Sequence, residues 1–539
     1  MRRRHRIRAA AVALALLVTA GAAGTAQAAG PEPERGPAPP TVVHTDTGLV
    51  RGRPTTEGRQ FLGIPYAEPP VGRLRWKEPR PAKPWQGVRD ATKFGNRCAQ
   101  TASWDPGYEK PTHTEDCLGL NVYVPDGGRP LERRPVMVWL HGGGLTAGAG
   151  EDIVPDTFAK QTGALVVTVN YRLGAMGFLA ARGLDAEAGD GVSGNYGMQD
   201  QQAALRWVRS NIANFGGDPG RVTVAGESAG GRSVCTQLAS PTGRGLFRAG
   251  IIQSGAYEDC AARERAKAAE DGAAFAKKAG CPHSATAVAC LRGKTPQEIL
   301  AAQSGIDWGP VAGGAFLPEQ PVRAFAKGAA AGIPVLNGAN QDEGRLFGFA
   351  QYDAQGKPLT TTDYPQALTG TFGPVMGGKV LERYPAGSYP SPTIAYGTAV
   401  GDRMFACPAL RLDTSLAGRG KVYAYEFADR TSPPFASLRQ LPTTFDFGAT
   451  HVNEVQYLFK HFGLDSPLNA EQRDLSRQMV EYWGSFIRDG VPRAAGQPGV
   501  PDGRERVLSL RTASAGGNTA SATVHREHLC DLWDAAATA

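Results

Sequence analysis

Short runs of apolar residues, many of them β-branched, recur along this chain and predict buried strands. They lie at residues 136–140, 164–169, 222–225 and 250–252. A strand with one exposed face alternates apolar and polar positions, whereas a continuous apolar run suits a strand that is covered on both faces. We therefore predict a central, mostly parallel sheet that is flanked by helices.

Helical periodicity lies between two of these runs. Leu205, Val208, Ile212 and Phe215 follow one another at helical spacing, and the turn-forming segment GGDP ends the pattern at 216–219. Strands and helices that alternate in this way form right-handed β-α-β units, which places the chain in the α/β class. Residues 261–400 are richer in alanine, glycine and helix-forming residues, and we expect helical excursions there that cover a site.

The N-terminus has a different pattern. Five arginines within MRRRHRIR precede an apolar run at 9–18, and Ala26-Gln27-Ala28 then offers small residues for cleavage. This pattern is typical of a signal peptide, and the apolar run is too short and too rich in alanine for a membrane span. We predict a cleaved signal peptide at 1–28, exported by the general or the twin-arginine route, a proline-rich tail at 29–40, and one domain over 41–539. The mature protein is then expected to be extracellular, without stable membrane insertion.

Composition changes this picture mainly by excluding classes of function. The chain has 539 residues, of which 41% are hydrophobic and 20% are charged, as is typical of a large globular protein. Its formal charge of +7 falls to about +2 without the leader, which holds five arginines and no acidic residue, so the charge does not indicate nucleic-acid binding. No cysteine or histidine spacing matches a metal site. We interpret His525 and His528 as a surface pair and expect neither a metal nor a cofactor.

The stretch RVTVAGESAGG at 221–231 carries the clearest chemistry. A predicted strand runs directly into the G-x-S-x-G motif centred on Ser228, and a predicted helix follows. Such a strained strand-to-helix turn exposes the serine as a nucleophile, and small flanking residues let neighbouring backbone approach. The alternative is a glycine-rich turn with an ordinary surface serine, which the strand and the helix on either side disfavour.

The segment HGGGL at 141–145 directly follows another predicted strand. Three successive glycines lose much backbone entropy on folding, so their presence indicates a backbone that something approaches closely. Attack of a serine on an ester creates an oxyanion, which backbone N–H groups stabilise. We expect Gly143, Gly144 and Ala229 to donate those hydrogen bonds.

A serine nucleophile needs a base and an acidic residue that orients the base. In a chain with this serine turn both follow the serine, the acidic residue first. The residues alone leave two choices open for each role. The acid is Asp342 or Glu343, in a loop after the apolar run at 333–336, and the base is His451 or His461.

Five segments together resemble the type-B carboxylesterase family, which includes cholinesterases and bacterial para-nitrobenzyl esterases. The resemblance covers nearly all of the chain after the tail, and segments in the family's order are far more specific than any one alone. They are FLGIPYAEPPVGRLRW at 61–76, EDCLGLNVYVP at 115–125, NYRLGAMGF at 170–178, GNYGMQDQQAALRWVRSNIANFGGDP at 194–219 and GESAGG at 226–231.

The resemblance implies an α/β-hydrolase fold, with one catalytic domain at 41–539 and helical excursions over the site. It also implies Ser228 as the nucleophile, Glu343, the second acidic residue of the D-E-G segment, as the acid, and His451 as the base. The expected function is that of a secreted serine esterase, which hydrolyses small-molecule carboxylic esters through an acyl-enzyme. We expect these esters to be uncharged or hydrophobic. Glu227 beside the serine either tunes the site electrostatically or merely completes the turn.

The resemblance extends to structural residues. It implies three disulfide bonds, Cys98 with Cys117, Cys281 with Cys290, and Cys407 with Cys530. Cys235 and Cys260 are left over, and we expect Cys235 to be a small buried thiol. Arg73 and Glu115 resemble a salt bridge of the family.

The chain departs from the family pattern around the substrate. The loop between Cys98 and Cys117 is shorter than in cholinesterases, and Trp104 is the candidate for their choline-binding tryptophan. Leu145 stands where the family often has an aromatic residue, and Gly313 stands where an aspartate is common. These departures leave the three expected catalytic residues intact and alter the pocket.

Two alternative functions, a lipase and an adhesion module, fit the sequence less well. A lipase acting on long-chain glycerides ranks lower, because no long amphipathic lid segment is visible in the sequence. A catalytically silent adhesion module, as in the neuroligins, would have lost the nucleophile. Ser228, Glu343 and His451 are all present, which argues against that interpretation.

Overall fold

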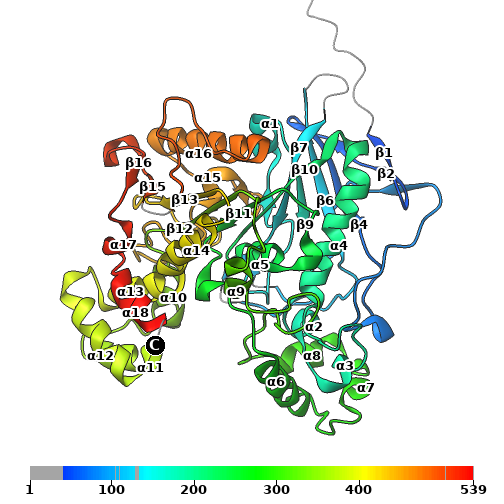
Figure 1. The fold of residues 1–539 in the computed structure, drawn as a ribbon, viewed down its shortest axis with the longest axis horizontal. Coiled ribbons are helices and arrows are strands. Elements are labelled where there is room, and N and C mark those ends of the chain that lie inside the picture. The colour runs from blue at the N-terminus through cyan, green and yellow to red at the C-terminus, as the bar shows by residue number, and fades with distance from the viewer. Residues whose placement is uncertain (1–40, 104, 109, 128–132, 504–505, 538–539) are drawn as a thin grey trace, which may run out of the picture. The chain divides into compact units, whose positions relative to one another are not determined.

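The predicted strands form the centre of one large twisted sheet (Figure 1). The computed structural model describes residues 41–103, 105–108, 110–127, 133–503 and 506–537. Within these residues the sheet has eleven strands, in the spatial order β16 (Thr519–Ser521), β15 (Val507–Leu510), β13 (Val422–Phe427), β12 (Val335–Asn340), β11 (Ala249–Gln253), β10 (Gly217–Glu227), β7 (Arg134–Leu140), β9 (Leu165–Val169), β6 (Gly119–Pro125), β4 (Gly58–Pro65) and β3 (Arg53–Pro54).

Parallel pairing dominates this sheet. Every neighbouring pair from β15 to β9 is parallel, whereas β16, β6, β4 and β3 join antiparallel at the edges. The predicted mostly parallel sheet is therefore confirmed, and the four apolar runs fall in β7, β9, β10 and β11.

The sheet is buried on both faces, which explains its continuous apolar runs. Val136, Val138 and Leu140 of β7 join the core on the side of α4 (Tyr196–Asn211) and α5 (Ala229–Ala239). Met137 and Trp139 of the same strand join the opposite core, on the side of α1 (Asp156–Thr162) and α16 (Ala470–Asp489). Successive residues of a strand point to opposite faces, so such a strand can have no polar alternation.

The predicted amphipathic helix is α4, followed by a 3₁₀ turn at Ile212–Phe215. The stripe of Leu205, Val208, Ile212 and Phe215 is buried throughout. The chain then turns at Gly216, whose φ of 93° lies in the left-handed region that favours glycine.

Helices fill the connections between strands, and two long connections rise from the sheet. The first, between β11 and β12, holds α6 (Arg265–Lys278), α7 (Ala287–Arg292), α8 (Pro296–Ala302) and α9 (Pro321–Ala326). The second, between β12 and β13, holds α10 (Arg345–Gln351), α11 (Tyr364–Phe372), α12 (Pro374–Arg383), α13 (Pro392–Gly401), a π-helical turn (Asp402–Ala406) and α14 (Cys407–Ala417). These are the helical excursions expected from residues 261–400.

The remaining elements are short. Two small sheets lie apart from the main one, β1 (Val42–Thr45) with β2 (Gly48–Arg51) and β5 (Val88–Asp90), and β8 (Ile153–Val154) with β14 (Lys460–His461). The other helices are α2 (Gly174–Phe178), α3 (Arg182–Asp185), α15 (Val455–Leu458), α17 (Val524–Glu527) and α18 (Cys530–Ala537).

Three of the sequence predictions concern residues beyond the described part of the chain. The signal peptide at 1–28, the tail at 29–40 and Trp104 all lie outside the described residues. Thr41–Ala539 forms one compact unit by itself. Among the described residues, no helix has the length and apolar character that crossing a bilayer requires.

Four disulfide bonds cross-link the described chain. Three are the pairs that the resemblance implies, Cys98–Cys117, Cys281–Cys290 and Cys407–Cys530. The fourth joins Cys235 to Cys260, so the expectation of a free thiol at Cys235 is wrong. Cys235 lies on α5 and Cys260 lies shortly after β11. The neighbouring strands β10 and β11 bring the two segments together, a proximity that sequence spacing does not reveal.

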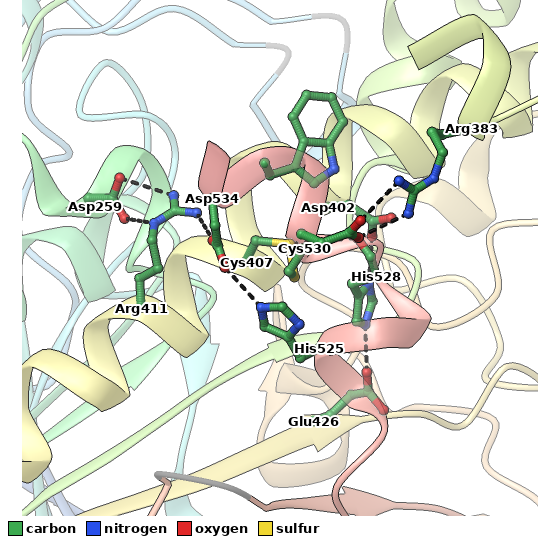
Figure 2. The surroundings of a disulfide bond; sticks show 12 residues. Asp259, Arg383, Asp402, Cys407, Arg411, Glu426, His525, His528, Cys530 and Asp534 are labelled. Atoms are coloured by element: carbon green, nitrogen blue, oxygen red, sulfur yellow. Dashed lines mark hydrogen bonds and ion pairs between the residues drawn. A yellow bond between two sulfur atoms is a disulfide. The ribbon is translucent and has the colours of Figure 1, made fainter. Parts of the chain in front are cut away.

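The C-terminal disulfide lies in a dense polar network (Figure 2). Both ring nitrogens of His528 bond to carboxylates, Nδ1 to Asp402 at 2.5 Å and Nε2 to Glu426 at 2.8 Å. Burial alone disfavours the charged ring, but the two carboxylates raise the pKa of His528 well above its usual value. His525 is exposed and pairs with Asp534, whereas His528 is buried, so the interpretation of both as surface residues is wrong for His528.

The expected salt bridge between Arg73 and Glu115 is wrong, because Glu115 pairs with Arg75. Arg73 lies in an exposed 3₁₀ turn, and Arg75 makes a two-pronged bond to Glu115 with distances of 2.6 and 2.5 Å. Arg75 also donates to the carbonyls of Leu291 and Lys294, which anchors the end of α7. The turn at 72–74 rotates the second arginine, not the first, towards the core.

Replacing Cys235 and Cys260 by alanine should lower the free energy of unfolding by about 3 kcal/mol, because the bridge restricts the unfolded chain. The matched control is the double alanine variant of Cys281 and Cys290. These bridges span 25 and 9 residues respectively, so the control should lose about 1 kcal/mol less. Denaturant unfolding under oxidising conditions measures both, and an equal or larger loss in the control would contradict the expectation.

Candidate active site

Ser228 lies on the turn that joins β10 to α5. Its φ of 54° and ψ of −122° are strained for a residue with a side chain. The turn is possible because glycines on either side of the serine let the backbone pack closely. A Cβ on Gly230 would lie 1.9 Å from the Leu140 carbonyl oxygen, and one on Gly226 would lie 2.4 Å from the Gly230 carbonyl carbon. The predicted serine turn is thus held between β7 and α5.

The glycine loop after β7 faces this turn. A Cβ on Gly142 would lie 2.7 Å from Glu227 Oε2, and one on Gly143 would lie 2.3 Å from the Ala147 carbonyl oxygen. Backbone packing and a φ of 96° therefore require glycine at position 143, independently of any substrate, whereas a side chain at position 142 would displace the Glu227 carboxylate. In the described structure the amides of Gly143, Gly144 and Ala229 donate to no protein acceptor.

His451 and Glu343 form a buried pair. Nδ1 of His451, in the loop between β13 and α15, lies 2.6 Å from Oε2 of Glu343. The other carboxylate oxygen of Glu343 accepts a 2.7 Å hydrogen bond from the Asn340 amide at the end of β12. Both side chains are buried. Glu343 is thereby fixed, and it fixes the orientation of the imidazole.

The other two candidates have different surroundings. Asp342 binds Arg345 and Arg430 at 3.0 and 2.9 Å and accepts from the Ala449 amide, so it stabilises the loop that carries His451. His461 is buried, and no carboxylate in the described structure contacts it. Burial lowers the pKa of His461 to about 3. Of the alternatives that the sequence leaves open, the structure pairs only Glu343 with His451.

Ser228, His451 and the glycine loop line one cavity of about 700 Å³. Nε2 of His451 lies 3.3 Å from Oε1 of Glu227, and no hydrogen bond joins the ring to the Ser228 hydroxyl in the described residues. In substrate-free enzymes such bonds are often long and tighten only with substrate. The required groups therefore share one cavity, with Glu227 beside the free ring nitrogen.

Comparison with known proteins now decides the family. Residues 39–523 match the sequence model of a protein family described as the carboxylesterase family. The chain belongs to the carboxylesterase family. It is 35% identical to a cocaine esterase of Oryctolagus cuniculus, over 89% of this chain and 94% of that one. It is also 35% identical to a para-nitrobenzyl esterase of Bacillus subtilis, over 84% and 90% of the two chains.

Solved structures agree. A PNB esterase structure matches this carboxylesterase with a TM-score of 0.75 and 31% identity, over 91% of this chain and 99% of that one. The expected α/β-hydrolase fold is thus confirmed. The protein is a carboxylic ester hydrolase, of a family whose members act on small-molecule esters.

Charge is concentrated around the imidazole of this carboxylesterase. Burial raises the pKa of Glu227 to about 8, and the nearby His451 opposes that shift. Burial alone would lower the pKa of His451, but the charges of Glu227 and Glu343 outweigh it and raise that pKa to about 9. Glu454 is also buried nearby, where Gln253 and Asn340 donate to its carboxylate. Glu227 therefore belongs to the electrostatics of the site and is not only a turn residue.

Aromatic rings form one wall of the cavity. Phe405 and Phe347 lie 4.7 and 5.2 Å from the His451 ring, and Tyr257 lies 5.5 Å from Phe405. Leu145, by contrast, is buried beside the loop. These rings come from the two long helical connections, and sequence spacing does not reveal how those connections lie over the sheet.

Arg232 lines the cavity and Glu454 acts on the charge of His451, but neither residue was predicted from the sequence. The sequence nevertheless holds a signal for each. Arg232 stands four residues after Ser228 and Glu454 three residues after His451. On a helix or a tight turn such spacings place side chains near one another.

The Gly230→Ala variant should be destabilised by about 3 kcal/mol and lose esterase activity, because its methyl group would overlap the Leu140 carbonyl. Gly378→Ala, in the interior of α12 where no atom lies within 4 Å, is the control and should be neutral or stabilised by up to about 1 kcal/mol. Thermal unfolding and residual activity measure both. A Gly230→Ala protein as stable and active as wild type would contradict the tight turn.

Proposed function

We propose that this carboxylesterase is a secreted serine esterase in which residues 41–539 form the catalytic domain, Ser228 is the nucleophile, His451 the base and Glu343 the orienting acid. The observation that carries the proposal is the 2.6 Å bond between His451 and Glu343 in the cavity that the strained Ser228 lines. Together these supply a hydroxyl that faces the cavity and an oriented imidazole.

The reaction proceeds in two halves. His451 takes the Ser228 proton as the hydroxyl attacks the ester carbonyl, and it then gives that proton to the leaving alcohol oxygen as the acyl-enzyme forms. Water, deprotonated by His451, attacks the acyl-enzyme, and the proton returns to Ser228 as the acid product leaves. Glu343 stabilises the imidazolium at each transfer.

The amides of Gly143, Gly144 and Ala229 stabilise the oxyanion. In the described structure they have no protein acceptor, and the amide of Ala229 begins α5, where N–H groups favour negative charge. Each such donor typically lowers the barrier by about 3 kcal/mol. All catalytic groups in this scheme belong to the chain, so it requires no cofactor.

Secretion is supported by two features of the chain. The pattern at 1–28 is that of a signal peptide. The four disulfide bonds suit an oxidising compartment.

The Ser228→Ala variant should lose ester hydrolysis by at least about 10³-fold while its unfolding temperature stays close to that of wild type, since the hydroxyl makes no hydrogen bond in the described structure. A fluorophosphonate should label the wild type stoichiometrically at this residue. The control is Ser254→Ala, which removes a buried serine with φ of 47° at the end of the adjacent strand β11 and should remain active and labelled. Label at another residue, or none on folded wild type, would refute the nucleophile.

The Glu227→Gln variant should move the acid limb of the kcat/KM profile to lower pH, on the order of one unit. The base must be neutral, and the negative charge of Glu227 favours the protonated ring, so its removal lowers the pKa of His451 from about 9. Glu454→Gln should shift the limb in the same direction by less, because Glu454 contributes less to that pKa. An unchanged limb in Glu227→Gln would show that this carboxylate does not act on the base.

A further inference from the structure

Arg232 is a buried cation at the edge of the catalytic cavity. It lies on α5, four residues after Ser228, and lines the same cavity. Only 4% of the residue is exposed. Residues four apart lie on one helix face, about 5–6 Å apart at their Cβ atoms. The side chain of Arg232 therefore leaves the helix within one turn of Ser228.

The protein leaves this charge incompletely paired. One NH₂ group donates to the Ala261 carbonyl, and the guanidinium lies 5.0 Å from the centre of the Tyr257 ring. Nε is buried without a hydrogen-bond partner in the described structure. The one carboxylate within 4 Å among the described residues is that of Glu258, at 3.8 Å, and 54% of the Glu258 side chain is exposed. Buried cations in proteins normally have a close, hydrogen-bonded anion.

The surrounding backbone keeps this pair open. Glu258, Asp259 and Cys260 have consecutive φ values of 53°, 56° and 58°, a left-handed turn of three residues with side chains. Arg411 binds both carboxylate oxygens of Asp259 and also holds Asp534 of α18 (Figure 2). The Cys235–Cys260 disulfide ties the other end of the turn to α5. These two restraints hold the backbone of the turn that carries Glu258.

The charges differ in how much solvent screens them. Glu258 and Asp307, which also lines the cavity, are less buried than Arg232, and water weakens their fields. Arg232 is buried, where a charge acts at a lower effective dielectric constant. Its positive potential therefore dominates locally. A neutral donor would suffice for the Ala261 carbonyl, so that hydrogen bond alone does not account for a charge here.

The position of Arg232 assigns it to one side of the ester. His451 must protonate the leaving oxygen, so the alcohol part of the substrate lies towards the imidazole. Phe405 lies against that ring, Tyr257 lies beyond Phe405, and Arg232 lies over Tyr257. Contacts therefore run from the imidazole through Phe405 and Tyr257 to the guanidinium, and Arg232 itself follows Ser228 by one helical turn. This arrangement favours the acyl side for the guanidinium.

We propose that Arg232 binds a carboxylate at the far end of the acyl group, so that this esterase accepts half-esters of short dicarboxylic acids. The substrate carboxylate takes the position beside the guanidinium that Glu258 approaches only loosely, and Glu258 remains in solvent. The inference rests on the acyl-enzyme reaction proposed for Ser228. One helical turn separates Ser228 from Arg232, so a short acyl chain suits this placement.

The test compares two ethyl esters of nearly equal shape by pH-stat titration. Monoethyl glutarate carries the distal carboxylate, and ethyl 5-methylhexanoate has an isopropyl group in its place. The measured quantity is the ratio of kcat/KM for the charged ester to that for the neutral ester. In Arg232→Met this ratio should fall about tenfold to a hundredfold, because a charge-assisted hydrogen bond is lost. In Glu258→Gln the ratio should rise, because a competing carboxylate is removed.

Opposite shifts in two variants cannot arise from a common folding defect. The matched control is Arg263→Met. Arg263 is another buried arginine beside an aromatic ring, but it pairs with Asp271 at 2.8 Å and does not line the cavity, so its replacement should leave the ratio unchanged. Glu258→Gln, an isosteric change at a largely exposed side chain, keeps the proposal testable if Arg232→Met does not fold.

An unchanged ratio in Arg232→Met, or no rise in Glu258→Gln, would overturn the proposal. So would a wild type that hydrolyses only the neutral ester, and in that case the Ser228 mechanism would stand. If wild type hydrolysed neither ester and took no fluorophosphonate label, the proposed mechanism itself would fail.

Discussion

The hydrogen bond between His451 and Glu343 joins two loops that are 108 residues apart and excludes both side chains from water. A buried carboxylate must have hydrogen-bond partners, and here one comes from the backbone and one from a side chain. The backbone amide of Asn340 donates to one carboxylate oxygen of Glu343, and the imidazole of His451 bonds to the other. Asn340 in turn donates to Glu454, and Gln253 donates to Glu454 while accepting from Trp483 of α16. The carboxyl ends of β11 and β12 are thereby tied to one imidazole.

Backbone strain is concentrated around the same cavity. Ser228, Val452 and the turn at 258–260 all have positive φ, and Val452 is β-branched, for which such a conformation is rare. Strained residues persist only where their surroundings hold them. Here the surroundings are the tight contact of Gly230 with β7, the Cys235–Cys260 disulfide, and the bonds of Arg411 to Asp259 and Asp534. Part of this restraint comes from the C-terminal helix α18, far from Ser228 in sequence.

The cavity combines two kinds of environment. Around His451 the buried carboxylates exceed the positive charge, which favours protonation of the imidazole. Near Arg232 a buried cation has only more exposed carboxylates beside it among the described residues. Phe405 contacts the His451 ring, Tyr257 contacts Phe405, and both rings contribute apolar surface to the cavity. In the mechanism and the substrate preference proposed above, proton transfer depends on the first group of charges and substrate selection on the second.

The sequence by itself determined four central strands, the serine turn and the glycine loop, because each depends on residues adjacent in the chain. Continuous apolar runs marked β7, β9, β10 and β11, and the G-x-S-x-G and HGGG spacings marked Ser228 and the free amides. Only the tertiary structure decided the partner of Cys235, the choice of Arg75 over Arg73 and the burial of His528. It also brought together Glu343 and His451, which the family resemblance had singled out. Those contacts join segments that become neighbours only when the parallel strands and their long helical connections pack, and no local pattern encodes that proximity.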